Sequence, residues 1–397
     1  MTREKILKEI LKIPSHNIIL ELPTGFGKTR LSIEKVKSLN IKTLLIVVNR
    51  VVHKTVWQEE IDKWWKNNSI NITMTTYVSL HKYAGNYDAI IWDEVHHFTE
   101  RCAEIVNTGY SSKYNIFLTA TLPKEAKEIL CNTFSNIYTY KKTLRNAIDS
   151  AILPDPKVFL IPLQLNNSLY TEEIVKNPKK GNPVTVFYNN RFTVSAIKNR
   201  KIVIKCTPFQ YISELDRQID WFKEKYMRTR NDVFKFKWLK LCGDRLKFLS
   251  DQKIPYTQEI LKLLDNYRTI TFCNNIEQTK ILGKYCINSK EEHSMEYYNM
   301  FNDKQINHIT ACNMLNESAN LVDCKVGIYN NLNSSDVIIK QRQGRTLRHN
   351  KPIIIIPYFK GTREAELIKK MSENYNPSLI TTIFNINDLM NSDEFSN

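Results

Sequence analysis

The sequence predicts an α/β protein built on parallel sheets. Apolar stretches of strand length alternate with segments of helix length through the first 120 residues. The run "KTLLIVVN" (42–49) is almost entirely apolar, as in a strand that helices cover on both faces. Strands joined by helices in this alternation predict parallel pairing with right-handed crossovers. The chain of 397 residues is long enough for two or three domains, each with its own core.

The stretch "LPTGFGKT" (22–29) lies between a predicted strand, "NIILEL" (17–22), and a predicted helix that begins at Lys28. Strand, Gly-rich turn and helix form the context of a phosphate-binding loop, in which backbone N–H groups and the helix N-terminus face the phosphates. We predict that Lys28 reaches the β- and γ-phosphates and that Thr29 ligates Mg²⁺. Leu22 stands where the usual pattern has Gly, and an ordinary turn before a helix is the alternative. The predicted nucleotide-binding residues are Pro23, Thr24, Gly25, Phe26, Gly27, Lys28, Thr29 and Arg30.

Two acids follow the apolar strand in "YDAIIWDEVHHF" (87–98). Ligands of parallel sheets bind at the carboxyl ends of the strands, which is where both the loop and these acids lie. Asp93 is therefore predicted to hold Mg²⁺ and Glu94 to polarise an attacking water. A solvated acidic turn is the alternative.

The charge balance favours a polyanionic partner. The formal net charge is +16 and the isoelectric point is about 9.3, which makes nucleic acid the first candidate and solubility the plainer explanation. The eight cysteines contain no C-x-x-C pair, so we expect buried thiols in a reducing compartment. We find no signal-peptide pattern and no apolar run of roughly 20 residues. We expect a soluble cytoplasmic protein, in the host cytoplasm if the source is viral, and a monomer with a possible partner subunit.

With these residues in place, the chain resembles a superfamily-2 helicase. "LPTGFGKT" is similar to motif I, where a first residue other than Gly is common, and "DEVH" (93–96) is similar to motif II in its DExH form. Segments similar to the remaining motifs follow in order: "VVNRVVHKTVWQEEIDKW" (47–64), "TTYVSL" (75–80), "LTAT" (118–121), "TITFCNNIEQTKIL" (269–282), "ITACNMLNESANL" (309–321) and "QRQGRTLRH" (341–349).

The resemblance implies two RecA-like parallel-sheet domains in tandem, with a β/helical insertion between them. It assigns 1–150 to the first domain, 151–265 to a linker and insertion, and 266–397 to the second domain. ATP and Mg²⁺ are the implied cofactors. Arg345 and Arg348 are the implied arginine fingers, Gln341 faces the nucleotide, and Asn320 stands near the ribose where the family usually has Asp. The first 21 residues contain no Gln, so the selectivity for adenine is open.

The motif variants favour DNA over RNA, because they are similar to those of excision-repair helicases, restriction motors and phage recombination helicases. The predicted function is an ATP-dependent DNA helicase or translocase in repair, recombination or replication. The alternatives are the motor subunit of a restriction or nuclease system, an RNA helicase, and a basic nucleic-acid-binding protein that does not hydrolyse ATP. Polar residues at strand ends are candidate contacts to phosphates and sugars: Asn49, Arg50, Thr75, Thr76 and Asn274.

The middle of the chain is expected to hold a crossover (151–165), a β-hairpin or small β insertion (182–206) and a mostly helical basic segment (214–249). Trp and Phe alternate with Lys and Arg in the helical segment, which suits stacking on single strands. For most of it we favour the plainer interpretation of an amphipathic helix with aromatic residues in a core and solvated lysines. The insertion as a whole is a possible nucleic-acid clamp.

Overall fold

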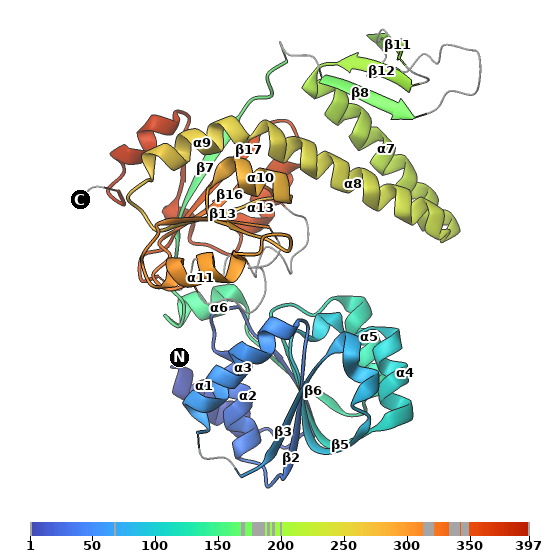
Figure 1. The fold of residues 1–397 in the computed structure, drawn as a ribbon, viewed down its shortest axis with the longest axis vertical. Coiled ribbons are helices and arrows are strands. Elements are labelled where there is room, and N and C mark those ends of the chain that lie inside the picture. The colour runs from blue at the N-terminus through green and yellow to red at the C-terminus, as the bar shows by residue number, and fades with distance from the viewer. Residues whose placement is uncertain are drawn as a thin grey trace.

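The computed structural model describes residues 2–66, 69–167, 201–312, 321–332, 342 and 349–395. For 171–176, 187–188, 191–192, 195–198 and 201–205 it describes the backbone alone. Two parallel sheets with their helices form the two ends of the molecule, and a smaller antiparallel sheet and a helical hairpin lie beside the second one (Figure 1). The predicted fold class, two RecA-like domains in tandem, is confirmed. In the described part of the chain, no helix combines the length and the apolar character needed to cross a bilayer.

The first sheet has six parallel strands in the order β3-β2-β4-β5-β1-β6. The strands are β1 (Asn17–Glu21), β2 (Thr43–Val48), β3 (Asn71–Thr76), β4 (Gly85–Trp92), β5 (Tyr110–Thr119) and β6 (Ile137–Lys141). The helices are α1 (Arg3–Leu11), α2 (Lys28–Lys37), α3 (Val51–Trp64), α4 (Glu100–Gly109), α5 (Lys124–Thr133) and α6 (Leu144–Asp149), with 3-10 turns η1 (Tyr77–Lys82) and η2 (Val95–His97).

Both faces of this sheet are covered, which explains why β2 has no polar side. Leu44 and Ile46 of β2 pack with the core under α1, α2 and α3, whereas Leu45 and Val47 pack with the core under α4 and α5. Successive side chains of a strand point to opposite faces, so a strand between two helical layers must be apolar at every position. Figure 1 shows the two helical layers on opposite sides of the sheet.

The second sheet has seven parallel strands in the order β14-β15-β13-β16-β17-β7-β18. They are β7 (Lys157–Leu163), β13 (Thr269–Phe272), β14 (Cys286–Ile287), β15 (His308–Ala311), β16 (Val326–Tyr329), β17 (Ile353–Phe359) and β18 (Ile380–Thr382). The described helices and 3-10 turns of this end are α9 (Ile254–Leu263), α10 (Ile276–Leu282), α11 (Ser294–Asn302), α13 (Glu364–Ser372), η4 (Pro377–Leu379) and η5 (Ile386–Asn391).

The second sheet begins with a strand that precedes residue 266, where the sequence resemblance placed the start of the second domain. β7 belongs to the segment expected to be a linker, yet it pairs in parallel with β17 along its whole length, from Lys157 opposite Ile353 to Leu163 opposite Phe359. The pairing joins segments nearly 200 residues apart. The insertion therefore interrupts the second domain after its first strand instead of preceding that domain.

The insertion contains strands and two long helices. β8 (Thr171–Lys176), β12 (Lys201–Cys206) and β11 (Ser195–Lys198) form an antiparallel sheet, and β9 (Phe187–Tyr188) pairs with β10 (Arg191–Phe192). α7 (Pro208–Thr229) begins in a capping box of Thr207 and Gln210, and α8 (Asp232–Gln252) begins at Asn231, whose side chain accepts from the Val233 N–H. The two helices form a hairpin that extends away from the second sheet (Figure 1).

Candidate active site

The loop between β1 and α2 is shaped by two glycines. Gly25 has φ 83° and Gly27 has φ 95°, a region that side chains with a Cβ rarely adopt. Gly27 is the N-cap of α2 and offers no side-chain oxygen to its first turn. The N–H groups at this helix end therefore face the loop instead of a capping side chain, as in anion-binding helix termini. The side chain of Phe26 is buried in the hydrophobic core and so anchors the loop.

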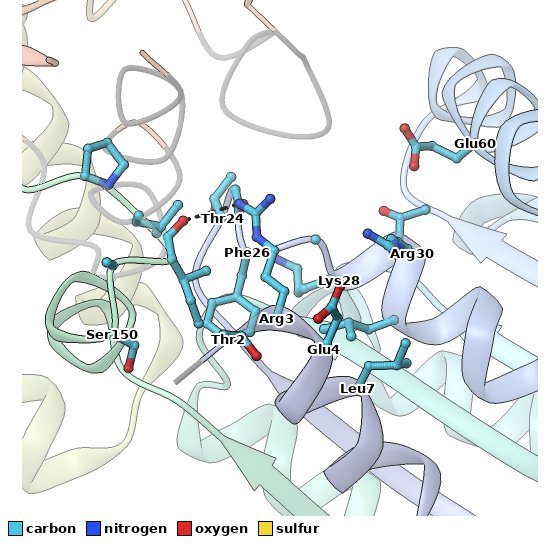
Figure 2. Close-up of a pocket in the computed structure, with 18 of the residues that line it drawn as sticks. Thr2, Arg3, Glu4, Leu7, Thr24, Phe26, Lys28, Arg30, Glu60 and Ser150 are labelled. Carbon is cyan, nitrogen blue, oxygen red and sulfur yellow. Dashed lines mark hydrogen bonds between the residues drawn. The ribbon is translucent and has the colours of Figure 1, made fainter. Parts of the chain in front are cut away.

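Lys28 is held at the base of this loop. Its Nζ donates to the carbonyl oxygen of Leu22 at 3.2 Å, the residue that joins β1 to the loop. The ammonium group is thereby directed back under the loop. Figure 2 shows Lys28 in the same pocket as Phe26 and Arg30.

Asp93 follows β4 at the same edge of the sheet and is 7% exposed. Its Oδ2 accepts from the Trp57 indole at 2.9 Å, and its Oδ1 accepts from the Glu94 N–H at 3.0 Å. Its carbonyl oxygen accepts from the Tyr77 hydroxyl at 2.9 Å. Burial, with the neighbouring Glu94 carboxylate as a second cause, raises the pKa of Asp93 to about 6, although the Trp57 bond and Lys28 act in the opposite direction.

This environment fits a divalent cation. A carboxylate with a raised pKa, next to a second acid, gains from any positive charge that approaches it. Thr29 and Asp93 supply a hydroxyl and a carboxylate to the same pocket, which are the hard oxygen ligands that Mg²⁺ prefers. Among the described residues no cluster of three or more His, Cys, Asp or Glu forms a metal site. Mg²⁺ bound here would complete its shell with water and the phosphates of the nucleotide, as is usual for this ion.

Glu94 has an unusual backbone. It adopts φ 48° and ψ 56°, the left-handed region, and its side chain is buried. Such conformations persist where the surrounding structure imposes them, and they are frequent at functional sites. Oε2 of Glu94 lies 3.4 Å from Nδ1 of His96. The same Nδ1 lies 3.4 Å from the Thr119 hydroxyl, which donates to the carbonyl of Thr121 at 2.7 Å.

His96 thus connects the acidic segment with the "LTAT" stretch at the end of β5. β5 lies between β4 and β1 in the sheet, so its carboxyl end is adjacent to both the acids and the phosphate loop. Three of the predicted motifs of the first domain, at 22–29, 93–96 and 118–121, therefore meet at one edge of the sheet.

The phosphate loop from Thr24 to Arg30, together with Trp57, Asp93 and Glu94, lines a pocket of about 1260 Å³. Its walls include residues of α1 (Thr2, Arg3 and Glu4), the segment 148–155, and His349 and Asn350 from the second domain. Arg3 donates to the carbonyls of Gly25 at 3.5 Å and Ile152 at 3.3 Å, and so joins the loop to that segment. Figure 2 shows Arg3 and Glu4 on the side of Lys28 and Ser150 across the pocket.

The structure brings together the loop from Thr24 to Arg30, Asp93 and Glu94, all in this one pocket. Pro23 precedes it and is buried. Gln341, Arg345, Arg348 and Asn320 lie outside the described residues. Arg342, from the same predicted motif as the arginine fingers, is described: it is buried and donates to the side-chain and backbone oxygens of Asn331. This bond ties the start of that motif to the end of β16.

The candidate nucleic-acid contacts differ in their exposure. Arg50 is exposed and Asn49 is half-buried, at the end of β2. Thr75 is completely buried, and Thr76 is buried with its hydroxyl accepting from the Ser79 N–H at 3.3 Å. The Thr75 and Thr76 side chains are therefore parts of the interior here, and a phosphate cannot reach Thr75. Asn274 is half-buried, and its Oδ1 accepts from the Asn331 amide at 3.3 Å.

Several residues of the site were not found from the sequence. Trp57 and His96 lie within segments that the resemblance covers, but no local pattern indicates that their side chains reach Asp93 and Thr119. The residues of α1 and of 148–155 carry no motif at all. Only the folded chain places them beside the loop.

Comparisons with known proteins agree with this geometry. Residues 3–124 match the family described as "Type III restriction enzyme, res subunit". The chain is 23% identical over 378 residues to the DNA 3'-5' translocase XPB2 of Sulfurisphaera tokodaii, a match that covers 89% of this chain and 80% of the relative.

Two solved structures share the fold. Dbp5 of S. cerevisiae bound to RNA and ADP BeF3 superimposes with a TM-score of 0.61 at 10% identity, covering 98% of this chain and 90% of Dbp5. The ATP-dependent Type ISP restriction-modification enzyme LlaBIII bound to DNA superimposes with a TM-score of 0.55 at 11% identity. This second match covers 99% of the present chain but 32% of LlaBIII. With the two parallel sheets and the site at the edge of the first, these matches support the predicted resemblance to superfamily-2 helicases.

Proposed function

We propose that the protein is an ATP-dependent DNA translocase or helicase. The observation that carries this proposal is the single pocket in which the loop at Lys28 meets the buried pair Asp93 and Glu94, with His349 and Asn350 of the second domain on its wall. A nucleotide in this pocket would touch both domains. Its hydrolysis would change the contacts between them, which is the kind of switch that drives domain opening and closing.

Phosphoryl transfer depends mainly on positioning and charge. In this proposal the loop N–H groups and Lys28 hold the β- and γ-phosphates, and Glu94 orients the attacking water and accepts its proton. Bound Mg²⁺ would neutralise charge on the phosphates, with Thr29 and Asp93 as its protein ligands. Arg345 and Arg348 are proposed as arginine fingers with Gln341 beside them, and Asn320 as the partner of the ribose. A finger of this kind contributes roughly 10³–10⁵ in rate.

DNA is the proposed substrate for two reasons. The relative that matches most of the chain is a DNA translocase, and the net charge of +16 suits a polyanion. Arg50, exposed at the end of β2, is the first candidate contact, followed by Asn49 and Asn274. Roles in repair, recombination or replication belong to this proposal, as does action as a monomer.

The test is steady-state ATP hydrolysis by the wild type, by Lys28→Ala and by Lys124→Ala, with single-stranded DNA, duplex DNA, branched DNA and RNA. Lys124 is exposed on α5 and serves as the matched control. We expect stimulation by one form of DNA, lost in Lys28→Ala and kept in Lys124→Ala. Glu94→Gln should retain bound ATP and DNA without turnover. Normal turnover by Lys28→Ala or Glu94→Gln would refute the site, and stimulation by RNA alone would identify an RNA remodelling enzyme.

A second function has its own support. The matched family is a restriction subunit, and LlaBIII is a restriction-modification enzyme about three times as long as this chain's match. The chain would then be the motor of a system whose nuclease lies in another subunit. Strong stimulation by duplex DNA, together with DNA cleavage only after a partner subunit is added, would favour this alternative over an independent helicase.

A further inference from the structure

The α7–α8 hairpin has a free end, residues 221–240, none of which packs against the described cores of either domain. All of these residues are described, and none is buried. The base of the hairpin is different, because Tyr211, Ile212 and Leu215 of α7 and Leu249 of α8 belong to the core of the second domain. With a rise of 1.5 Å per residue, the free end of each helix extends for roughly 13 Å.

Aromatic residues hold the two helices of this free end to each other. Tyr226 and Trp238 lie with ring centroids 6.2 Å apart, and Phe222 and Phe234 lie 6.3 Å apart. All four are half-buried. The expectation that the aromatic residues of 214–249 form a core is therefore correct for these four, but the core is a narrow seam within the hairpin.

Other apolar side chains point away from this seam. Phe236 is 70% exposed and Val233 is 59% exposed, whereas Trp221, which is 46% exposed, keeps its ring centroid 6.2 Å from that of Phe234 in the seam. On α8, Val233, Phe236 and Lys240 are spaced at i, i+3 and i+7, so they share one face of the helix, opposite the seam residues Phe234 and Trp238. For Phe236 the expectation of a buried aromatic residue is wrong. A phenylalanine with this exposure contributes little to the stability of the hairpin, so its packing does not explain it.

The same free end is strongly basic. Residues 221–240 contain seven Lys or Arg and two acids, Glu224 and Asp232. Glu224 is engaged by Arg228. Within the described part of the chain Lys235, Lys237 and Lys240 form no ion pair. Cations lie close to aromatic rings, with Lys225 Nζ 5.5 Å from the Trp221 ring centroid and the Arg230 guanidinium 5.7 Å from that of Tyr226.

We propose that the free end of the α7–α8 hairpin is a second nucleic-acid contact surface, which binds a single strand through its phosphates and its unstacked bases. Exposed aromatic faces among lysines that have no acidic partner in the described part of the chain provide both contacts that single-strand binding needs. Lysine is depleted in the centres of protein interfaces, and helices that lie on membranes need a broad continuous apolar face. Neither a protein nor a lipid surface fits this mixture as well. The proposal rests on nucleic acid being the substrate of the motor.

The base of the hairpin is locked to the second domain. Arg363, next to the start of α13, pairs with Asp216 and Asp220 of α7, and Arg245 of α8 also pairs with Asp216. At the end of α8, Lys253 pairs with Glu364 at 2.5 Å, and both side chains are buried. Buried pairs of this kind define one geometry, because breaking them leaves an uncompensated charge. The hairpin therefore moves with the second domain, and it would carry its bound strand when the nucleotide closes or opens the pocket.

The test compares Phe236→Ala and the double variant Lys237→Glu/Lys240→Glu with the wild type in the full-length protein. The matched control is Lys124→Glu/Lys127→Glu on α5, where both lysines are exposed. Because Phe236, Lys237 and Lys240 are exposed, the variants should keep the wild-type helix content and melting temperature. Fluorescence anisotropy with a 30-nucleotide single strand, as DNA and as RNA, gives the affinity. ATP hydrolysis is measured without nucleic acid and with saturating strand.

We expect each hairpin variant to bind the single strand about tenfold more weakly, since stacking on one aromatic side chain has an effect of this size. Hydrolysis without nucleic acid should equal that of the wild type, and the control variant should bind normally. Unchanged affinity in both hairpin variants would overturn the proposal while leaving the ATP site untouched. A concentration-dependent dimer that Phe236→Ala abolishes, or binding to anionic vesicles that it abolishes, would overturn it in favour of a second copy or a membrane. If no nucleic acid stimulated hydrolysis but the hairpin variants still bound the strand more weakly, the proposed motor function would be refuted. The proposed contact surface would still be supported.

Discussion

The indole N–H of Trp57 donates to Oδ2 of Asp93 at 2.9 Å and so connects the middle of α3 with the end of β4. The bond is buried, and it favours the ionised carboxylate against the burial and the Glu94 charge that raise its pKa to about 6. Asp93 must be ionised to hold Mg²⁺. Trp57 therefore supports the ionised state that Asp93 needs for its proposed role as a ligand of Mg²⁺.

Trp57→Phe should weaken the binding of Mg-ATP in a pH-dependent manner. Without the indole donor the pKa of Asp93 rises further, so a larger fraction of the carboxyl is protonated at pH 6.5 than at pH 8.5. A hydrogen bond to a charged group contributes about 1.5–3 kcal/mol, so KM for Mg-ATP should rise about tenfold at pH 6.5 and clearly less at pH 8.5. Trp92→Phe, which removes a buried indole bond to Asn115 instead, is the control. An equal rise at both pH values would contradict the role given to Trp57.

Asp93→Asn should stabilise the protein in the absence of nucleotide while it abolishes hydrolysis. The folded pKa of about 6 exceeds the ordinary 3.8, so the folded state binds more protons than the unfolded state between these values. The Asp93 contribution to the free energy of unfolding therefore falls as pH rises from about 4 to about 6. The two units correspond to about 3 kcal/mol, the advantage expected for Asn at pH 7.5.

The measurement is the difference in free energy of unfolding between Asp93→Asn and the wild type from pH 3.5 to 8, because other titrating groups cancel in that difference. It should be near zero at the acid end and reach its plateau above pH 6. Added Mg-ATP should stabilise the wild type alone. The wild type should then have the larger free energy of unfolding of the two proteins. A difference that did not change with pH would show that Asp93 is ionised as readily in the fold as in the unfolded chain.

Gly27→Ala tests the phosphate loop against a matched glycine. Gly27 at φ 95° and Gly361 at φ 70° both adopt the left-handed region, and a Cβ at either would meet no heavy atom within 4 Å. Each Ala variant should lose about 1 kcal/mol of stability from backbone strain. Only Gly27→Ala should also weaken ATP binding, by at least tenfold, because it moves the N–H groups of the loop. Equal ATP affinity in the two variants, measured by calorimetry, would exclude the loop as the phosphate site.

The sequence predicted the features that depend on residues close together in the chain. It did not predict those that depend on contacts between distant segments. The loop at Lys28 and the acids at Asp93 were predicted because a Gly-rich turn and an acidic strand end are local patterns within apolar strands. The pairing of β7 with β17 was not, since nothing in Lys157–Leu163 identifies a partner nearly 200 residues away. For this reason the assignment of 151–265 to a linker and insertion left β7 out of the second domain.

Exposure was the second property that local patterns did not determine. Thr75 lies near the end of β3, as a phosphate contact should, but its side chain is completely buried. Phe236 has the spacing of a core residue, yet no element packs against its face of α8. Periodicity predicts that a helix has an apolar face, and only the tertiary structure decides whether a neighbour covers it.

Thr119→Val should separate hydrolysis from its stimulation by nucleic acid. The Thr119 hydroxyl lies 3.4 Å from His96 and donates to Thr121, so it joins the acidic segment to the end of β5. Val keeps the buried shape but cannot hold His96. We expect hydrolysis without nucleic acid within about twofold of the wild type and stimulation by DNA reduced about fivefold, a loss of about 1 kcal/mol of coupling. Thr269→Val, the same change at a buried strand position of the second sheet, should leave stimulation intact. If DNA stimulated hydrolysis by Thr119→Val as strongly as by the wild type, the contact between Thr119 and His96 would have no part in the coupling.

The salt dependence of DNA binding tests whether the motor holds the backbone. Each phosphate neutralised by Lys or Arg adds about 0.7 to the slope of log affinity against log salt for a single strand. A strand bound across both domains should give a slope of at least about 3 in magnitude. Arg50→Ala should remove one phosphate contact, so the slope should fall by about 0.7 in magnitude. Binding should weaken equally for all DNA sequences. Thr75→Val, at a buried position of the neighbouring strand end, should leave the slope unchanged. A flat response in the wild type would mean that the protein reads DNA through contacts other than its phosphates.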